Sequence, residues 1–360
     1  MKLAVFSAKP YDKLFLTRVQ TAADEGATTS SGQVHHHVEL IFHEFSLSLD
    51  TVALAKGADA VCVFVNDVLD EHVLTELHTL GVHAVLLRCA GYNNVDLKAA
   101  DRLGLFVANV PSYSPEAVAE FAMALLQTLN RNTHRAYNRV REGNFSLDGL
   151  LGKTMRGKTV GIVGTGKIGI ALARILNGFG CRMLAYDPYP NSLFETYGEF
   201  VPLEALLEQS DFVSLHCPLT DGTRHIINEK TLQQMKKGAM LVNTSRGGLI
   251  HTKSVIAALK SRHLGGLALD VYEAEGQLFY ADHSDEIIED DELMRLMTFP
   301  NVLVCGHQAF FTEEALTEIA ECTLRNMDDF IRRNPCKNSL VESGNHKLVL
   351  SKRASIPVRI

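Results

Sequence analysis

GIVGTGKIG, residues 161–169, decides how the middle of this chain folds. Its glycines Gly164, Gly166 and Gly169 follow an apolar run, and a helix is predicted to begin near Lys167. Gly164 would allow a tight turn, Gly166 would let a pyrophosphate approach the backbone, and Gly169 would let the helix lie close to a sheet. The free N–H groups at the start of that helix favour phosphate. We therefore predict a dinucleotide site; the alternative is a glycine-rich turn that binds nothing.

Asp187 indicates which dinucleotide to expect. It ends the apolar run MLAYD (183–187), close to where such folds carry an acidic residue for the ribose. A carboxylate there accepts hydrogen bonds from the ribose hydroxyls and repels a 2′-phosphate. The sequence therefore favours NAD over NADP as the cofactor.

Short apolar runs alternate with helical stretches through most of the chain, for example with a helix expected over 94–103. The predicted strands are LAVFSA (3–8), VELIFHEF (38–45), AVCVFV (60–65), AVLLRCA (84–90) and LFVAN (105–109), then TVGIVG (159–164), MLAYD (183–187), FVSLHCP (212–218), AMLVNT (239–244), GLALDV (266–271) and NVLVCG (301–306). This alternation predicts the α/β class with parallel sheets. The six strands of the second series suffice for a complete dinucleotide-binding domain.

Length and composition narrow the classes of protein. A chain of 360 residues usually forms more than one domain. With 46% hydrophobic and 21% charged residues it has the composition of a soluble globular protein. A net charge of −7 without a basic patch argues against nucleic acid as a binding partner. The lack of a long apolar run argues against a membrane-spanning helix. Seven cysteines without a CxxC pair indicate reduced thiols and a cytoplasmic protein.

Two long helices are predicted around the second series of strands. Residues 111–142 read as one helix with Ser114 as N-cap and Pro115 at its first position. Its first half is apolar on most faces, which favours burial either against a second subunit or between two domains of one chain; the residues concerned are Ala117, Val118, Phe121, Met123, Leu125 and Leu126. A last helix, about 312–333, opens with Thr312 as a cap and could return to the first domain.

Three polar residues follow three successive strands of the second series. Arg246 follows AMLVNT, Glu275 follows GLALDV, and His307 follows NVLVCG. Ligands of doubly wound sheets bind outside the carboxyl ends of the strands, so these side chains are expected on the cofactor's side. An arginine can bind a carboxylate, a histidine can exchange a proton with a carbonyl oxygen, and a glutamate can orient the imidazole. Each alone reads as a surface or packing residue; together they indicate an active site.

The sequence also resembles the D-2-hydroxyacid dehydrogenases, most closely their NAD-dependent D-lactate dehydrogenases. The stretches that carry the resemblance are RCAGYNNVD (88–96), NVPSYSPEAVAE (109–120), GTGKIG (164–169), SLHCPLT (214–220), VNTSRGG (242–248), LDVYEAE (269–275) and GHQAF (306–310). They cover roughly residues 1–340. The resemblance implies reduction of pyruvate to D-lactate by NADH.

The resemblance also implies roles for individual residues. Arg246, Glu275 and His307 would form the catalytic triad, and Ala90, Gly91, Tyr113 and Arg246 would bind the substrate. The residues implied for the cofactor are Gly164, Gly166, Lys167, Ile168, Gly169, Asp187, Cys217, Pro218, Thr223, Thr244, Ser245 and Asp270.

The implied architecture has two Rossmann-like or flavodoxin-like parallel-sheet domains with the active site in the cleft between them. Residues 1–110 and 312–340 would form the substrate domain, 111–311 the NAD-binding domain and 341–360 a tail. A homodimer or homotetramer is expected.

Two rival functions stay open. One is a related dehydrogenase for a bulkier or phosphorylated 2-keto acid, such as phenylpyruvate or hydroxypyruvate. The other is a non-enzymatic, NADH-sensing co-repressor-like protein, which can retain the triad.

Residues 21–37 and 343–360 do not fit the pattern. The first segment is polar and suggests a surface loop, and the tail shows no clear pattern. Its run His35, His36 and His37 raises the question of a metal. Neighbouring side chains on an extended chain point to alternate faces, so we expect no metal site.

Overall fold

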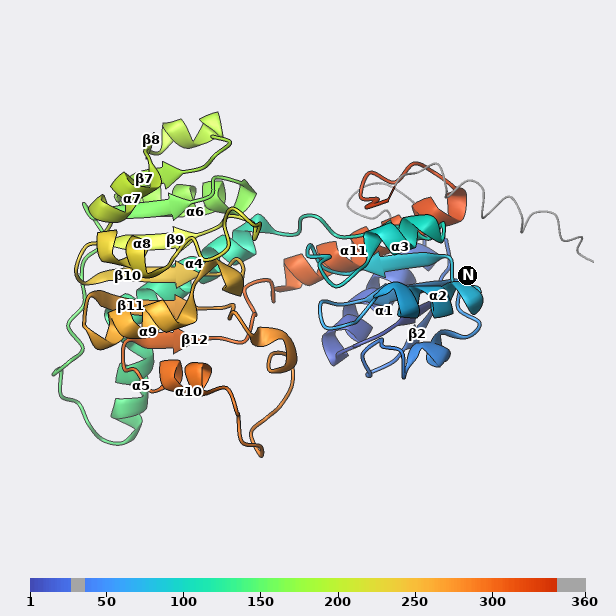
Figure 1. Cartoon of the computed structure of the whole chain (residues 1–360), viewed down its shortest axis with the longest axis horizontal. Helices are drawn as coiled ribbons and strands as arrows, with labels where there is room; N and C mark the ends of the chain where they lie inside the picture. The colour runs from blue at the N-terminus through green and yellow to red at the C-terminus, as the bar shows by residue number, and fades with distance from the viewer. Residues whose placement is uncertain (27–35, 342–360) are drawn as a thin grey trace, which may run out of the picture. The chain divides into compact units, whose positions relative to one another are not determined.

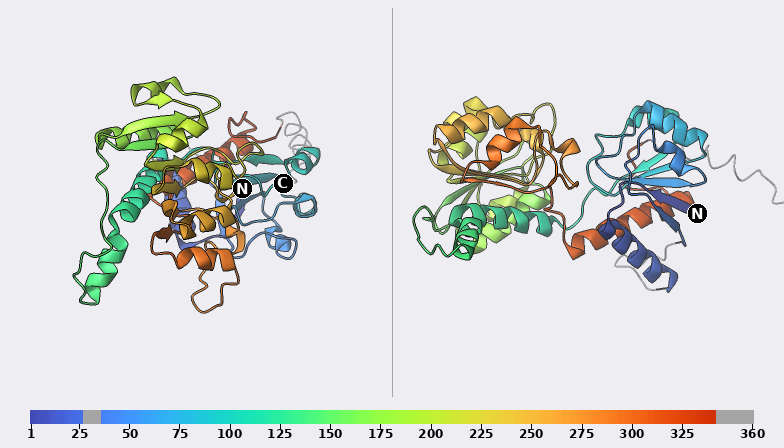
Figure 2. Two further views of the ribbon diagram at one scale, coloured as in Figure 1. Left: turned by 60° about the vertical axis from the view of Figure 1, so that its left-hand side comes forward. Right: turned by 90° about the horizontal axis from the view of Figure 1, so that it is seen from below.

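The computed structural model describes residues 1–26 and 36–341 and divides into two compact units (Figure 1). Unit 1 contains Met1–Ser114 and the segment that begins at Thr312. Unit 2 contains Pro115–Phe311. Each unit has a parallel sheet with helices on both faces (Figure 2), which confirms the predicted fold class.

The sheet of unit 1 has five strands in the order β2-β1-β3-β4-β5, an arrangement of the flavodoxin type. The strands are β1 (Lys2–Val5), β2 (Glu39–Phe42), β3 (Ala60–Val63), β4 (Ala84–Leu87) and β5 (Phe106–Ala108). The helices are α1 (Pro10–Asp24), α2 (Glu71–Thr79), α3 (Leu97–Arg102) and α11 (Glu313–Arg332), with the 3₁₀ turn η1 (Val52–Ala55). The side chain of Thr312 caps α11 by accepting from the N–H of Ala315, as predicted. The last helix thus belongs to the first unit.

The sheet of unit 2 has seven strands in the order β12-β11-β10-β9-β6-β7-β8. The strands are β6 (Thr159–Val163), β7 (Arg182–Tyr186), β8 (Glu199–Phe200), β9 (Phe212–Leu215), β10 (Ala239–Asn243), β11 (Leu264–Leu269) and β12 (Val302–Val304). The helices are α4 (Pro115–Arg131), α5 (Thr133–Arg141), α6 (Lys167–Gly178), α7 (Leu203–Gln209), α8 (Glu229–Gln234), α9 (Thr252–Lys260) and α10 (Asp291–Met297), with the 3₁₀ turns η2 (Ser192–Thr196), η3 (Gly247–Leu249) and η4 (Glu275–Gln277). The six predicted strands are confirmed, and the two-residue β8 was not predicted.

The strand order of unit 2 reverses at β6, which has β7 on one side and β9 on the other. At such a reversal the connections leave the sheet toward opposite faces, and this opens a crevice at the carboxyl ends of the strands. The glycine turn follows β6 at this point. The two central strands at the reversal, β6 and β9, are buried throughout.

The prediction of one long helix over 111–142 was wrong. The helix starts at Pro115 as expected, but it breaks at Asn132, whose φ of 52° is left-handed. Asparagine tolerates this conformation better than most residues, so it separates α4 from α5. The apolar residues of α4 pack on α6, β10 and β11 within unit 2. A second subunit is therefore not needed to cover them.

The expected loop over 21–37 was partly wrong. Residues 21–24 continue α1, whose last turn contains the good helix formers Ala22 and Ala23. Residues 27–35, with His35, and the predicted tail beyond 341 lie outside the described residues. Within the described part of the chain, no helix is long and apolar enough to cross a membrane.

Candidate active site

The glycine turn after β6 has the geometry that its sequence predicted. Gly164 has a φ of +99°, and a Cβ there would lie 2.7 Å from the backbone of His216 and Cys217. A Cβ on Gly169 would lie 2.1 Å from the carbonyl oxygen of Gly164. Only glycine fits at these two positions, because one needs a left-handed backbone and both need close backbone contact.

Gly166 differs because a Cβ would meet no atom within 4 Å. It is the N-cap of α6, and Lys167 and Ile168 are the first two residues of that helix. The open space beside Gly166 therefore lies at a helix N-terminus, where the first N–H groups have no carbonyl partner within the helix. These features fit a pyrophosphate.

Asp187 directly follows β7, beside the glycine turn. Its Oδ2 accepts from the N–H and hydroxyl of Thr165, at 2.7 and 2.9 Å, and its Oδ1 accepts from the N–H of Tyr189 at 2.9 Å. Each carboxylate oxygen has two lone pairs, so the group retains acceptor capacity for a ribose. The side chain is thereby oriented before any ligand arrives.

The segments after β9 and β10 contain the remaining predicted cofactor residues of unit 2, apart from Asp270. The hydroxyl of Ser245 donates to the carbonyl of Cys217 at 2.7 Å, and that of Thr223 donates to the carbonyl of Pro218 at 2.6 Å. The Thr244 hydroxyl is inaccessible to solvent and has no hydrogen-bond partner. A buried hydroxyl without a partner is costly, so Thr244 fits a place where a ligand completes the bonding.

Arg246 stands three residues after β10, at the start of the 3₁₀ turn η3. One guanidinium nitrogen donates to the carbonyl of Ser245 at 2.7 Å, and the side chain of Asn243 donates to the carbonyl of Arg246 at 2.9 Å. The guanidinium is only partly buried. A planar group with five donors can still pair with a carboxylate through two parallel hydrogen bonds.

His307 and Glu275 form a pair. The Nδ1 of His307 lies 3.0 Å from Oε1 of Glu275, while Oε2 of Glu275 accepts from the N–H of Tyr272 at 2.9 Å. The two side chains are 18% and 25% exposed, so both groups are held in place but reachable. With Nδ1 facing the carboxylate, Nε2 is the nitrogen that can exchange a proton with a substrate.

Asp270, the predicted cofactor residue after β11, holds the backbone of the histidine turn. Its carboxylate accepts from the N–H groups of Gln308 and Ala309 at 2.8 and 2.9 Å, and its carbonyl accepts from the N–H of His307 at 2.7 Å. Burial raises the pKa of this carboxyl, although the two N–H donors oppose the effect. His307 itself has a φ of 55°, a rare conformation that these bonds sustain.

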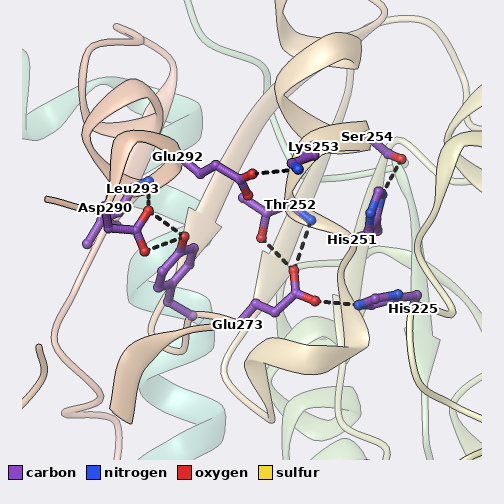
Figure 3. A network of polar contacts seen from close by, with 10 residues as sticks. His225, His251, Thr252, Lys253, Ser254, Glu273, Asp290, Glu292 and Leu293 are labelled. Atoms are coloured by element: carbon purple, nitrogen blue, oxygen red, sulfur yellow. Dashed lines mark hydrogen bonds and ion pairs between the residues drawn. The ribbon is translucent and has the colours of Figure 1, made fainter. Parts of the chain in front are cut away.

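Two glutamates lie close together after β11 and have different partners. Glu275 meets His307, whereas Glu273 accepts from the N–H and hydroxyl of Thr252, at 3.2 and 2.9 Å, and meets Nε2 of His225 at 2.5 Å (Figure 3). The acidic run YEAEG gave no signal that would separate them. The network around Glu273 was missed by the sequence reasoning.

The predicted substrate residues Ala90, Gly91 and Tyr113 belong to unit 1. Ala90 and Gly91 follow β4, and the carbonyl of Ala90 accepts from the side chain of Asn109 at 2.8 Å. Tyr113 is half-buried and stands just before Ser114, the last residue of this part of the unit. Because β4 and β5 are neighbours, the residues after them meet at one edge of the sheet.

Three buried asparagines support the Ala90 turn, and none of them was predicted. Asn326 in α11 donates to the carbonyl of Asn109 at 2.8 Å, and Asn338 donates to Asn326 at 2.8 Å. The three residues are at most 9% exposed. They come from parts of the chain far apart in sequence, so no local pattern announces them.

The histidine run has carboxylate partners in its described part. His36 pairs with Asp328 at 2.5 Å, and His37 pairs with Asp24 at 3.0 Å. Among the residues that the structure describes, no group of three or more histidine, cysteine or acidic side chains could hold a metal.

The sequence of this chain is similar to those of known dehydrogenases. Residues 123–309 match the family model described as the D-isomer specific 2-hydroxyacid dehydrogenase, NAD binding domain. The chain is 63% identical over 362 residues to 2-hydroxyacid dehydrogenase A of Aspergillus oryzae, with full coverage of both. It is 65% identical over 345 residues to D-lactate dehydrogenase kk1H of Curvularia clavata, covering 96% of this chain and 97% of that protein.

A solved structure agrees over nearly the whole chain. The apo-structure of D-lactate dehydrogenase from Escherichia coli superposes with a TM-score of 0.84 at 49% identity, covering 95% of this chain and 100% of the other. Together with the glycine turn, Asp187 and the matched NAD-binding model, this establishes both family and cofactor. The chain belongs to the D-isomer specific 2-hydroxyacid dehydrogenases, and its cofactor is NAD.

Proposed function

We propose that this protein is a D-lactate dehydrogenase that reversibly reduces pyruvate to D-lactate with NADH. The observation that carries the proposal is the group Arg246, Glu275 and His307, which follows the neighbouring strands β10, β11 and β12, with Nδ1 of His307 3.0 Å from Glu275. The similarity to proteins named D-lactate dehydrogenase supports pyruvate as the substrate.

NADH, when bound, supplies the hydride that reaches the keto carbon. Arg246 binds the substrate carboxylate and polarises the neighbouring carbonyl. His307 gives a proton from Nε2 to the carbonyl oxygen and takes one in the reverse direction. Glu275 orients the imidazole and stabilises its protonated form through Nδ1.

The residues around the glycine turn would hold the cofactor. The N–H groups at the start of α6 would bind the pyrophosphate beside Gly166, Asp187 would bind the ribose, and the Thr244 hydroxyl would gain a partner. The further residues proposed for cofactor contact are Gly164, Lys167, Ile168, Gly169, Cys217, Pro218, Thr223, Ser245 and Asp270. Ala90, Gly91 and Tyr113 are proposed to contact the substrate.

The structure offers an argument against a phosphorylated substrate at the Ala90 turn. Arg88 is the cation nearest in sequence to that turn, but its side chain is 2% exposed and its Nε lies 3.0 Å from Asp12. A guanidinium that is already paired and buried is a poor receptor for a phosphate. A small, uncharged substrate side chain therefore fits better.

We also propose that the protein forms a homodimer or homotetramer through α5 and residues 142–152. No residue of α5 is buried, and Leu147 and Leu151 beyond it are 82% and 95% exposed. Helix α5 projects from the body of unit 2 (Figure 2). Exposed apolar side chains gathered on one projection are typical of a protein contact. Light scattering would show an oligomer for the wild type and a smaller species for Leu147→Ser with Leu151→Ser.

The test of the activity is NADH oxidation at 340 nm with pyruvate, phenylpyruvate, hydroxypyruvate, glyoxylate and 3-phosphohydroxypyruvate. The chirality of each product would be determined. We expect the highest kcat/KM with pyruvate and a product of D configuration. A higher kcat/KM with phenylpyruvate or hydroxypyruvate would change the proposed substrate but not the proposed reaction. No turnover on any of the acids would favour the NADH-sensing co-repressor.

A further inference from the structure

Three segments that contribute residues to the proposed active site meet at the side chain of Glu273 (Figure 3). Glu273 lies two residues before Glu275. Thr252 is the first residue of α9, in the segment that follows Arg246. His225 follows Thr223 in the segment after β9. The carboxylate of Glu273 therefore joins its own loop to two others.

The bonds of Glu273 use both carboxylate oxygens. Oε2 accepts two hydrogen bonds from Thr252, from its N–H and its hydroxyl, and Oε1 meets Nε2 of His225 at 2.5 Å. The N–H of Thr252 lies at the N-terminus of α9, where a carboxylate also interacts favourably with the helix dipole. Burial opposes ionisation of Glu273, but the bonds from His225 and Thr252 outweigh it and lower the pKa of this carboxyl.

The loop of Glu273 and the loop of Arg246 are in direct contact. A Cβ on Gly247 would lie 2.0 Å from the carbonyl of Tyr272 and 2.5 Å from the N–H nitrogen of Glu273. The turn from Arg246 to Ile250 is short and hydrogen-bonded, because Leu249 donates to the carbonyl of Arg246 and Ile250 to that of Gly247. A shift of one loop is therefore transmitted to the other.

The third segment is bound to the same turn. The N–H of His225 donates to the carbonyl of Gly248 at 2.9 Å, and Ile227 pairs with Ile250 in an isolated parallel bridge. His225 has a φ of 52°, so its backbone is also held in an uncommon conformation. His225 thus links the segment after β9 to the Arg246 turn through its backbone N–H and to Glu273 through its imidazole.

We propose that Glu273 is a positioning residue that fixes Arg246 relative to Glu275 and His307. The proposal rests on the proposed function, since it assigns Glu273 to the geometry of that site. Glu273 acts on the triad indirectly: through Ala274 toward Glu275, and through Thr252 and the η3 turn toward Arg246. Loss of its bonds should loosen the carboxylate-binding arginine more than the pyrophosphate site, because its partners His225 and Thr252 follow β9 and β10, whereas the glycine turn follows β6.

The test compares three variants of decreasing severity in the full-length protein. Glu273→Ala removes all three bonds, Glu273→Gln keeps an acceptor for Thr252, and Thr252→Val removes only the hydroxyl donor. A small displacement at an active site can cost one to two orders of magnitude, so we expect Glu273→Ala to lower kcat/KM for pyruvate about ten- to a hundredfold. Most of the loss should appear as a higher KM, and the order of the variants should follow the bonds removed.

A matched control is Glu292→Ala. Glu292 lies in the same region (Figure 3) and pairs with Lys253 of α9 at 3.5 Å, but it takes part in none of the hydrogen bonds of Glu273 given above. It should keep the wild-type KM. The Kd for NADH, measured by fluorescence, should stay unchanged in all variants, and Tm would show whether each remains folded.

The outcomes separate the two proposals. Suppose that the wild type is active. The positioning role alone would then be overturned if folded Glu273→Ala kept the wild-type KM and kcat/KM. It would also be overturned if Glu273→Gln and Thr252→Val were as impaired as Glu273→Ala. If Glu273→Ala does not fold, the graded effect of the other two variants decides the question. A wild type that reduces none of the five keto acids would overturn the proposed function and this role with it.

Discussion

Two ion pairs, one in each unit, show how burial separates a structural pair from a reactive one. Arg88 and Asp12 in unit 1 have side chains that are 2% and 9% exposed, whereas His307 and Glu275 in unit 2 are 18% and 25% exposed. Both pairs have an N–O distance of 3.0 Å. The difference is in what else can reach them.

The buried pair is enclosed by its own unit. Arg88 also donates to the carbonyl of Ser7 at 2.8 Å and lies over the ring of Phe64 at 5.0 Å. Its charge joins the ends of β1 and β4 to the start of α1. A guanidinium does not lose its proton in proteins, so this pair can only hold structure. An imidazole that is partly exposed can bind and release a proton, which is what the proposed reaction requires.

The largest effect is expected at the reactive pair. His307→Gln removes the proton donor, and general acid–base catalysis contributes about 10²- to 10⁴-fold, so kcat should fall by that factor. Binding of NADH, followed by fluorescence, should be unchanged. His283→Gln is the control, because His283 pairs with Glu286 at 2.7 Å outside the triad. Near-native turnover of His307→Gln would refute its assignment as acid and base.

Disruption of the buried pair should lower the stability of the fold. Arg88→Met leaves the Asp12 carboxylate buried without its partner, which costs about 3–5 kcal/mol in the free energy of unfolding. Urea unfolding measures this loss, and Arg102→Ala serves as the control because Arg102 and Glu71 form an exposed pair at 2.8 Å. The control should lose at most about 1 kcal/mol. Equal losses in the two variants would mean that burial does not distinguish the pairs.

His216 shows the effect of burial on a histidine that, unlike His307, is not paired with a carboxylate in the described contacts. Its Nε2 lies 2.8 Å from the Ser214 hydroxyl, its Nδ1 is inaccessible without a hydrogen-bond partner, and burial lowers the pKa of His216 to about 4. Between pH 6.5 and about 4, His216 is therefore protonated in the unfolded chain but neutral in the folded chain. The contribution of neutral His216 to the free energy of unfolding should be complete above pH 6.5 and should be lost as the pH decreases through this window.

The expected contribution of His216 at pH 5 is about 1–2 kcal/mol. Urea unfolding at pH 7.5 and pH 5 should show a smaller acid-induced loss in His216→Gln than in the wild type. His72→Gln, at an exposed position, should behave as the wild type. The same acid-induced loss in His216→Gln as in the wild type would exclude this histidine as a cause.

The smallest effect is expected at the carboxylate of the reactive pair. Glu275→Gln keeps an acceptor for the imidazole but removes the negative charge beside it, so the pH–rate profile of reduction should move to lower pH. The profile of kcat/KM for pyruvate measures this shift. An unchanged profile would remove Glu275 from the mechanism.

Much of the fold followed from local patterns in the sequence. Apolar runs bounded by turns predicted eleven strands that the structure confirms, and the spacing of Gly164, Gly166 and Gly169 predicted a turn that needs glycine at its first and third positions. The placement of Arg246, Glu275 and His307 after three adjacent strands was also predicted, because the carboxyl ends of parallel strands share one edge. The strands could be predicted because they depend on short stretches of sequence, and the triad could be placed because the parallel topology follows from the alternation of strands and helices.

Other features depend on residues far apart in sequence, and only the tertiary structure decided them. The left-handed Asn132 divides a stretch that is helical by pattern, and the apolar side of α4 is covered by α6 and the sheet. Glu273 and Glu275 are the same residue type in one acidic run, yet His225 and Thr252 bind the first and His307 binds the second. A sequence specifies which side chains can form hydrogen bonds, but the packing of distant segments determines which partners they reach.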